Sequence, residues 1–202
     1  RRLAPLVVAG LVALVYLNSI DNSFHYDDLH VIEENPHIED LSLIPSFFRE
    51  PALFSRDADK GMYRPLLLTT FALNYAWSER QVYSYHVVNI VLHATTSVFV
   101  WLLLGTLNVS VSFRLLGTLL FALHPIGTEP VNYISSRSDS LSALFYLLGI
   151  CLFVWGRSGG ERRRTWQSFG AAGALALGLL SKSTVITLPA VLLLYDFLHS
   201  GR

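Results

Sequence analysis

Charged side chains are scarce in this sequence, and their scarcity excludes an ordinary soluble domain. They make up 15% of the 202 residues, whereas a soluble domain carries about 25%. The formal net charge is zero, so no general electrostatic attraction to nucleic acid is expected. The single cysteine, Cys151, stands in an apolar run, which excludes a disulfide framework within this chain.

The motifs of several common sites are also missing. The sequence has no glycine-rich phosphate loop, no Cys-x-x-Cys pair and no His-Glu-x-x-His, so soluble nucleotide binding and structural zinc have no support. The histidines occur at scattered spacings. Their spacing therefore assigns no metal ligands. No cofactor is firmly implied, and binding of a divalent metal stays an alternative.

Apolar residues are abundant instead, at 52% of the chain. They gather in six segments with little charge: residues 3–20, 87–107, 113–123, 138–156, 168–180 and 184–198. Because about 20 residues cross a bilayer, the third, fifth and sixth segments are short for a span. The last two form either two short helices or one crossing with a re-entrant piece. The sequence therefore predicts an all-α, multi-pass integral membrane protein embedded in the lipid bilayer.

The two ends of the sequence suggest a piece of a longer protein. The chain begins with Arg1-Arg2 rather than methionine and stops soon after an apolar segment. A signal peptide would end at a small-x-small cleavage site, which Asn18-Ser19-Ile20 does not supply. We therefore expect the first apolar segment to be a retained helix.

Basic residues predict how the spans are oriented. Arg1 and Arg2 precede the first segment, and alternating crossings put residues 108–112 and the arginine-rich residues 157–164 on the same side. Arginine and lysine favour the cytosolic side. The loops at 21–85, 124–137 and 181–183 then face the lumen or periplasm, and the first of them holds most of the acidic residues.

The first of these loops is too long for a simple connector. Within it, Ile38, Leu41, Ile44, Phe47 and Phe48 recur at helix-like spacings, which is typical of amphipathic helices lying along a membrane surface. A small packed subdomain over the helix ends is the alternative, and the two interpretations are compatible.

Two adjacent carboxylates follow the first apolar segment, in Phe24-His25-Tyr26-Asp27-Asp28. Carboxylates at a membrane boundary are costly to bury and often mark function. Asp27 or Asp28 could act as a general base toward a hydroxyl group. A pair that only caps a helix in an acidic loop is the alternative.

Other polar residues lie at the predicted boundaries of the same face. Arg64 could bind a phosphate with two parallel hydrogen bonds. His86, Asn89 and His93 share one face of a helix, where they could also be an interhelical hydrogen-bonding stripe. The remaining candidates lie in the second and third loops: His124, Glu129, Arg137, Asp139 and Lys182.

These residues together resemble a known family. The matching segments are Asn22-Ser23-Phe24-His25-Tyr26-Asp27-Asp28, Tyr63-Arg64-Pro65-Leu66, Tyr85-His86-Val87-Val88-Asn89, the block His124 to Val131, and Ser136-Arg137-Ser138-Asp139. Their order and spacing are similar to those of membrane-embedded O-mannosyltransferases that carry tetratricopeptide repeats.

The resemblance implies an incomplete GT-C transmembrane helix bundle. Such enzymes move a sugar, typically mannose, from a dolichyl or polyprenyl phosphate to Ser or Thr hydroxyls of an acceptor protein on the luminal or periplasmic face. It implies the endoplasmic reticulum in a eukaryote and the inner or plasma membrane in a bacterium.

It also implies roles for single residues. Asp27 and Asp28 match the acidic motif, with Asp28 preferred as the base although the sequence does not separate them. Residues for the donor phosphate or sugar are then Arg64, His86, His124, Glu129, Arg137, Asp139 and Lys182.

The sequence departs from the family after Lys182, where an acidic residue is common and Ser183 stands here. Because a GT-C core needs more spans than this, we expect the fragment to be inactive alone. Two other functions stay open: a non-catalytic membrane anchor for tetratricopeptide repeats, and a fragment of a transporter.

Overall fold

The computed structural model describes residues 3–157 and 159–199. This part of the chain contains nine α-helices: α1 (Ala4–Tyr16), α2 (Ile44–Phe47), α3 (Pro65–Ser78), α4 (Val82–Thr106), α5 (Val111–Leu123), α6 (Glu129–Asn132), α7 (Arg137–Arg157), α8 (Glu161–Leu179) and α9 (Leu188–His199). Among these described residues no strand occurs. The all-α prediction is confirmed.

Short helical turns fill most of the connections. They are η1 (Leu17–Asp21), η2 (Leu29–Glu33), η3 (Pro36–Ile38), η4 (Leu41–Leu43), η5 (Pro51–Phe54), η6 (Ala58–Lys60), η7 (Pro125–Thr128), η8 (Ile134–Ser136) and η9 (Ser183–Thr187). Proline stands in the first turn of several of them, where its missing N–H removes no helical hydrogen bond.

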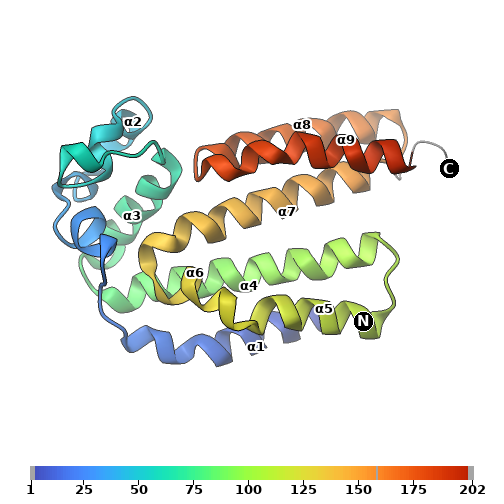
Figure 1. The fold of residues 1–202 in the computed structure, drawn as a ribbon, viewed down its shortest axis with the longest axis horizontal. Helices are drawn as coiled ribbons and strands as arrows, with labels where there is room; N and C mark the ends of the chain where they lie inside the picture. The colour runs from blue at the N-terminus through green and yellow to red at the C-terminus, as the bar shows by residue number, and fades with distance from the viewer. Residues whose placement is uncertain (1–2, 158, 200–202) are drawn as a thin grey trace.

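The long helices lie side by side in two groups (Figure 1). One group contains α1, α4 and α5, the other contains α7, α8 and α9, and α4 packs against α7 between them. The connections after α1, α5 and α8 all lie toward the same end of the bundle, which we call the loop end. The three loops that the sequence puts on one side therefore meet in space.

In the described part of the chain, three helical stretches are long and apolar enough to cross a membrane: Ala4–Asp21, Val82–Thr106 and Ile134–Arg157. The pair Val111–Leu123 and Pro125–Asn132, bent by 54°, adds a fourth if it is one broken span. The segment Ser183–His199 is apolar but shorter. Every apolar segment of the sequence is thus helical, whereas five or six crossings stay a prediction. Arg1 and Arg2, on which the orientation partly depends, lie outside the described residues.

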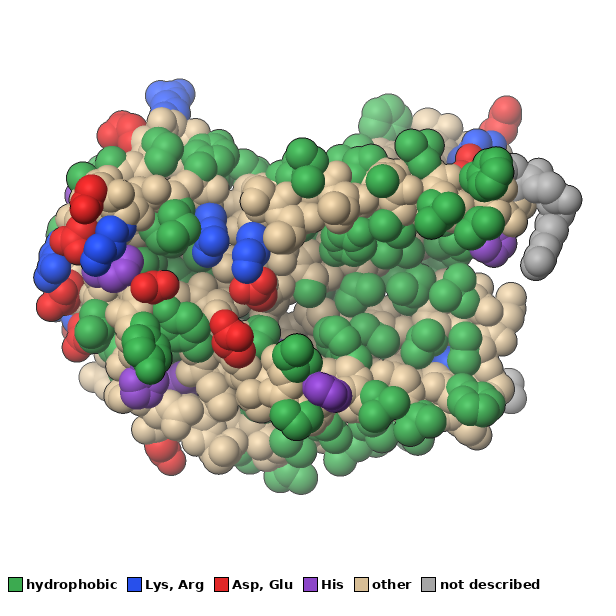
Figure 2. Space-filling model, in the orientation of Figure 1, with side chains coloured by type: hydrophobic (Ala, Val, Ile, Leu, Met, Phe, Trp, Pro, Cys, Tyr) green, Lys and Arg blue, Asp and Glu red, His purple; other side chains and the backbone are tan. Residues whose placement is uncertain are grey.

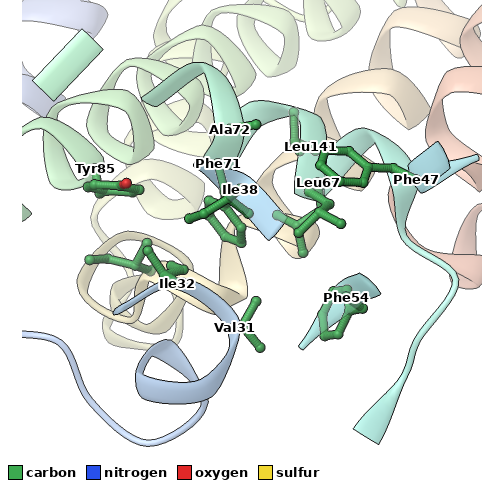
Figure 3. Close-up of a cluster of buried hydrophobic side chains, with 12 residues drawn as sticks. Val31, Ile32, Ile38, Phe47, Phe54, Leu67, Phe71, Ala72, Tyr85 and Leu141 are labelled. Carbon is green, nitrogen blue, oxygen red and sulfur yellow. The ribbon is translucent and has the colours of Figure 1, made fainter. Parts of the chain in front are cut away.

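The first loop folds into a packed subdomain at the loop end. Its buried side chains form one cluster with those of α3, α4, η8 and α7: Val31, Ile32, Ile38, Phe47, Phe54, Leu67, Leu68, Phe71, Ala72, Tyr85, Ile134 and Leu141 (Figure 3). The predicted helix periodicity is divided among η3, η4, α2 and η5 because prolines interrupt it. Leu41 and Phe48 remain exposed, so contact with a membrane surface stays a prediction for them.

The polar stripe on α4 holds the bundle together. His86 Nδ1 donates to the carbonyl of Val131 at 3.4 Å, and His93 Nε2 donates to that of Ala122 at 2.9 Å. Asn89 donates to the carbonyl of Val131 at 3.4 Å. All three side chains are buried. The interhelical alternative for this stripe is therefore the one observed: it joins α4 to the end of α5 and to α6.

Candidate functional site

The first turn of α7 and the turn before it connect all the segments of the loop end. Consecutive residues contact different segments: Ser135 donates to Asp28, Ser136 to Glu129 and Arg137 to Asn89, whereas Ser138 accepts from Arg64 and Asp139 from Lys182. A small rotation of α7 would change every one of these contacts. This segment therefore positions the candidate site.

Asp28 is fully buried, and its hydrogen bonds connect two segments of the chain. Its Oδ1 accepts from the Ser135 backbone N–H at 2.7 Å and from the Ser135 hydroxyl at 2.5 Å. Its Oδ2 accepts from the His25 N–H at 3.1 Å. With 0% of its surface exposed, Asp28 ties the first loop to η8, directly before α7.

The burial of Asp28 predicts a pH effect on stability. Burial raises the pKa of this carboxyl above 3.8, although the hydrogen bonds from Ser135 and His25 act to lower it. Since the folded-state pKa exceeds the unfolded one, the contribution of neutral Asp28 is full below pH 3.8 and is lost as the pH rises through the raised value. Asp28→Asn should lack this loss. The measurement compares unfolding free energies of both proteins across that pH range, and parallel curves would contradict the prediction.

Asp27, the neighbouring carboxylate, is open to solvent. Its side chain is 59% exposed, and its Oδ1 lies 3.4 Å from His30 Nε2. Its backbone N–H donates to the Tyr133 hydroxyl at 3.1 Å. Burial raises the pKa of Tyr133 to about 12, so the phenol keeps its proton at neutral pH. Asp27 is therefore held in place by its backbone while its carboxylate stays available.

A cavity of about 720 Å³ lies against Asp27. We call it the charged cavity, because five charged residues predicted from the sequence line it: Asp27, Arg64, Glu129, Asp139 and Lys182. Figure 2 shows acidic and basic side chains gathered over the loop end, beside a hollow between the two groups of helices. Carboxylates and cations thus share one space.

The two cations in this set are fixed by α7. The Arg64 guanidinium donates to the Ser138 hydroxyl at 3.2 Å and lies over the Phe54 ring, 6.0 Å from its centre. Lys182 Nζ donates to Asp139 at 2.5 Å. Both side chains are only partly exposed. They therefore present positive charge to the cavity with little freedom to turn away.

Besides the buried Asp28, three predicted site residues do not line the charged cavity. His86 is buried between α4 and α6. His124 accepts the Ile126 N–H at 3.2 Å within its own turn and lines a different, mostly apolar cavity of about 500 Å³. Arg137 is wholly buried.

Arg137 holds three helices together from inside. Its guanidinium donates to Asn89 Oδ1 at 2.7 Å, to the Tyr85 carbonyl at 3.1 Å and to Thr70 at 3.3 Å. It also lies 4.7 Å from the centre of the Phe71 ring. None of the carboxylates in the described residues forms an ion pair with it within 4.0 Å. The geometry favours a positioning role over contact with a donor.

Several residues that line the charged cavity are not predicted from the sequence. They are Tyr26, His30, Phe54, Lys60, Tyr133, Ser135 and Ser138. Tyr26 and Ser138 are adjacent to predicted site residues, and this adjacency is the sequence signal that could have identified them. Tyr133 and Phe54 stand in no motif, and only the fold brings them to Asp27. Within the described ranges no group of three metal-ligating side chains comes together.

The chain is similar to known proteins over most of its length. The profile of a family described as "Dolichyl-phosphate-mannose-protein mannosyltransferase" matches residues 61–199. The human protein O-mannosyl-transferase TMTC3 is 30% identical, with 96% of this chain and 22% of that protein aligned. The Xenopus laevis protein O-mannosyl-transferase tmtc2 is 33% identical, with 96% and 24% aligned.

A further relative, the mouse protein O-mannosyl-transferase TMTC4, is 30% identical, with 98% of this chain and 30% of that protein aligned. The chain thus spans between about a fifth and a third of the length of these relatives. No solved structure matches it.

Proposed function

This chain belongs to the dolichyl-phosphate-mannose-protein mannosyltransferase family, and on that premise we propose that it forms part of a membrane-embedded enzyme that mannosylates proteins. The donor is mannose linked to a dolichyl or polyprenyl phosphate, and the acceptor is a Ser or Thr hydroxyl on the luminal or periplasmic face. One observation carries the proposal: an exposed carboxylate, Asp27, shares the charged cavity with Arg64 and Lys182.

In this proposal Asp27 is the general base. Its carboxylate takes the proton of the acceptor hydroxyl while the hydroxyl oxygen attacks the anomeric carbon of the sugar. The bond between that carbon and the phosphate oxygen breaks, and the prenyl phosphate leaves with the bonding electron pair. Asp28 is too buried to reach the hydroxyl, so we assign it to positioning. This reverses the preference for Asp28 that the sequence suggests.

Arg64 and Lys182 bind and neutralise the leaving phosphate. Preorganised cations lower the free energy of a transition state in which negative charge develops on the departing oxygen. Their hydrogen bonds to Ser138 and Asp139 fix them before the donor arrives. The acidic partner that Ser183 does not supply to Lys182 comes instead from Asp139 on α7, which supports the enzyme over the non-catalytic anchor.

Arg64→Gln in the full-length protein should raise the KM for the donor about tenfold to a hundredfold. The expectation follows from the loss of about 1.5–3 kcal/mol when a charge-assisted hydrogen bond to a phosphate is removed. Arg49→Gln is the matched control, because Arg49 is exposed in the same loop and outside the charged cavity. Steady-state kinetics with purified donor measure both; an equal KM for the two variants would exclude Arg64 from the donor site.

The activity itself is tested with the full-length protein reconstituted in liposomes. Radiolabelled mannose on a polyprenyl phosphate is supplied together with synthetic peptides that contain Ser or Thr, and labelled peptide is the product. The alternatives have their own readouts. An anchor would bind no donor, and a transporter would move a labelled substrate into sealed vesicles without forming a glycopeptide.

A further inference from the structure

A second cavity, of about 510 Å³, adjoins the charged cavity. It lies between the segment after α1 and the segment around α6, and it is lined by Asn22, His25, Thr128 and Asn132 together with three residues that also line the charged cavity. Those shared residues are Tyr26, Glu129 and Tyr133. We call this space the tyrosine cavity. Tyr26, Glu129 and Tyr133 are the wall between it and the charged cavity.

Tyr26 is held in an unusual conformation at this wall. Its φ angle is 49°, in the left-handed region that bulky residues rarely adopt and that costs about 1–3 kcal/mol when they do. The residue is nonetheless 85% exposed. Its ring meets that of Tyr133 edge-on, with the centres 6.2 Å apart. The strained backbone therefore holds an exposed aromatic ring beside Asp27. Because this ring is mostly exposed, burial of its apolar surface does not explain the conformation.

The chemistry of the tyrosine cavity differs from that of the charged cavity. Among its described lining residues there is no lysine or arginine, so it has no fixed positive charge for a phosphate. It offers two aromatic rings and the amide of Asn132, whose Oδ1 is buried without a hydrogen-bond partner in the described part of the chain. An unpaired buried acceptor beside ring surfaces suits a backbone N–H and an apolar or small side chain.

We propose that the tyrosine cavity binds the acceptor polypeptide, next to the residue that is to be modified. The proposal rests on the mannosyltransferase function proposed above. When the Asn132 side chain turns toward the cavity, its Oδ1 accepts a backbone N–H of the acceptor, and Tyr26 and Tyr133 cover the neighbouring acceptor side chains. The acceptor hydroxyl then extends past Tyr133 into the charged cavity. The hydroxyl of Tyr133 itself accepts the Asp27 N–H at 3.1 Å. In this arrangement acceptor and donor approach Asp27 from opposite sides.

Two substitutions in the full-length enzyme test the proposal. Tyr26→Gly removes the ring at a position where glycine adopts φ 49° without strain, so the loop keeps its fold. Asn132→Leu removes the free acceptor. Each should raise the KM for a synthetic Thr-containing peptide about threefold to tenfold, the loss expected for one aromatic contact or one hydrogen bond. The KM for the donor is measured with the same variants.

Two controls separate binding from folding. Tyr26→Phe keeps the ring and should keep the peptide KM of the unaltered protein. Tyr83→Ala removes another exposed tyrosine that lies outside both cavities, and it should also leave that KM unchanged. A photoreactive phenylalanine placed at position 26, but not at position 83, should crosslink to the same peptide.

The outcomes distinguish this inference from the function on which it rests. If the unaltered enzyme transfers mannose but Tyr26→Gly and Asn132→Leu leave the peptide KM unchanged, the tyrosine cavity is not the acceptor site and the function stands. If these variants instead raise the KM for the donor, the cavity binds the donor and the proposal is overturned. If the unaltered enzyme binds the donor but transfers mannose to no peptide, the proposed function itself is wrong, whatever the variants show.

Discussion

Asp27→Asn should reduce kcat for mannose transfer by about a hundredfold to ten-thousandfold, the contribution typical of a general base. Asparagine keeps the size of the side chain but cannot take a proton from the acceptor hydroxyl. The Asp27 backbone contact with Tyr133 survives the change because it uses the main-chain N–H. Donor affinity and folding should therefore be almost unaffected, and radiolabel transfer by purified full-length protein measures the loss.

Two control variants sharpen this test. Asp21→Asn changes an exposed carboxylate of the same loop that lies outside the charged cavity, and its kcat should match that of the unaltered protein. Asp28→Asn should lower stability together with activity, since an amide cannot accept all three of the hydrogen bonds that converge on Asp28. A stable, inactive Asp28→Asn beside an active Asp27→Asn would reverse the two roles.

Arg137→Ala should destabilise the protein by about 3–5 kcal/mol, which is large among single substitutions. The change leaves the acceptors on Asn89, Tyr85 and Thr70 buried without their donor, and it opens a cavity against Phe71. Thermal unfolding of the purified full-length protein in detergent, followed by the loss of the monodisperse peak, measures the effect.

The comparison with other substitutions identifies the cause. Arg137→Lys keeps the charge but cannot reach all these acceptors with one ammonium group, so it should recover only part of the stability. Arg49→Ala, at an exposed position, should change stability by less than about 0.5 kcal/mol. If Arg137→Ala were as stable as the unaltered protein but showed a raised KM for the donor, the direct donor contact predicted from the sequence would be the correct role.

Much of the fold follows from the order of apolar and polar residues. Each apolar segment of the sequence became part of a helix, because a helix satisfies the backbone hydrogen bonds of a water-excluded segment within that segment itself. The first loop was harder to predict. Its apolar residues Ile38 and Phe47 have helical spacing, but prolines divide the helix and the ring of Phe47 packs with Leu67 in a local core.

The candidate site was predictable in its parts and unpredictable in its assembly. Arg64, Asp139 and Lys182 stand at the ends of apolar segments, and such positions can be recognised one by one. Whether a polar residue at such an end faces a cavity or the interior depends on the direction in which its helix packs. Arg137 and Asp139 are two residues apart, yet the first is wholly buried and the second lines the charged cavity.

The sequence by itself determined a helical membrane protein with its acidic motif beside a boundary and with cations on the same side. It could not distinguish Asp27 from Asp28, because the two have the same side chain and adjacent positions. The tertiary structure separates them: neighbouring residues in a helical turn point about 100° apart, so one carboxylate is buried against Ser135 of η8 while the other faces the cavity.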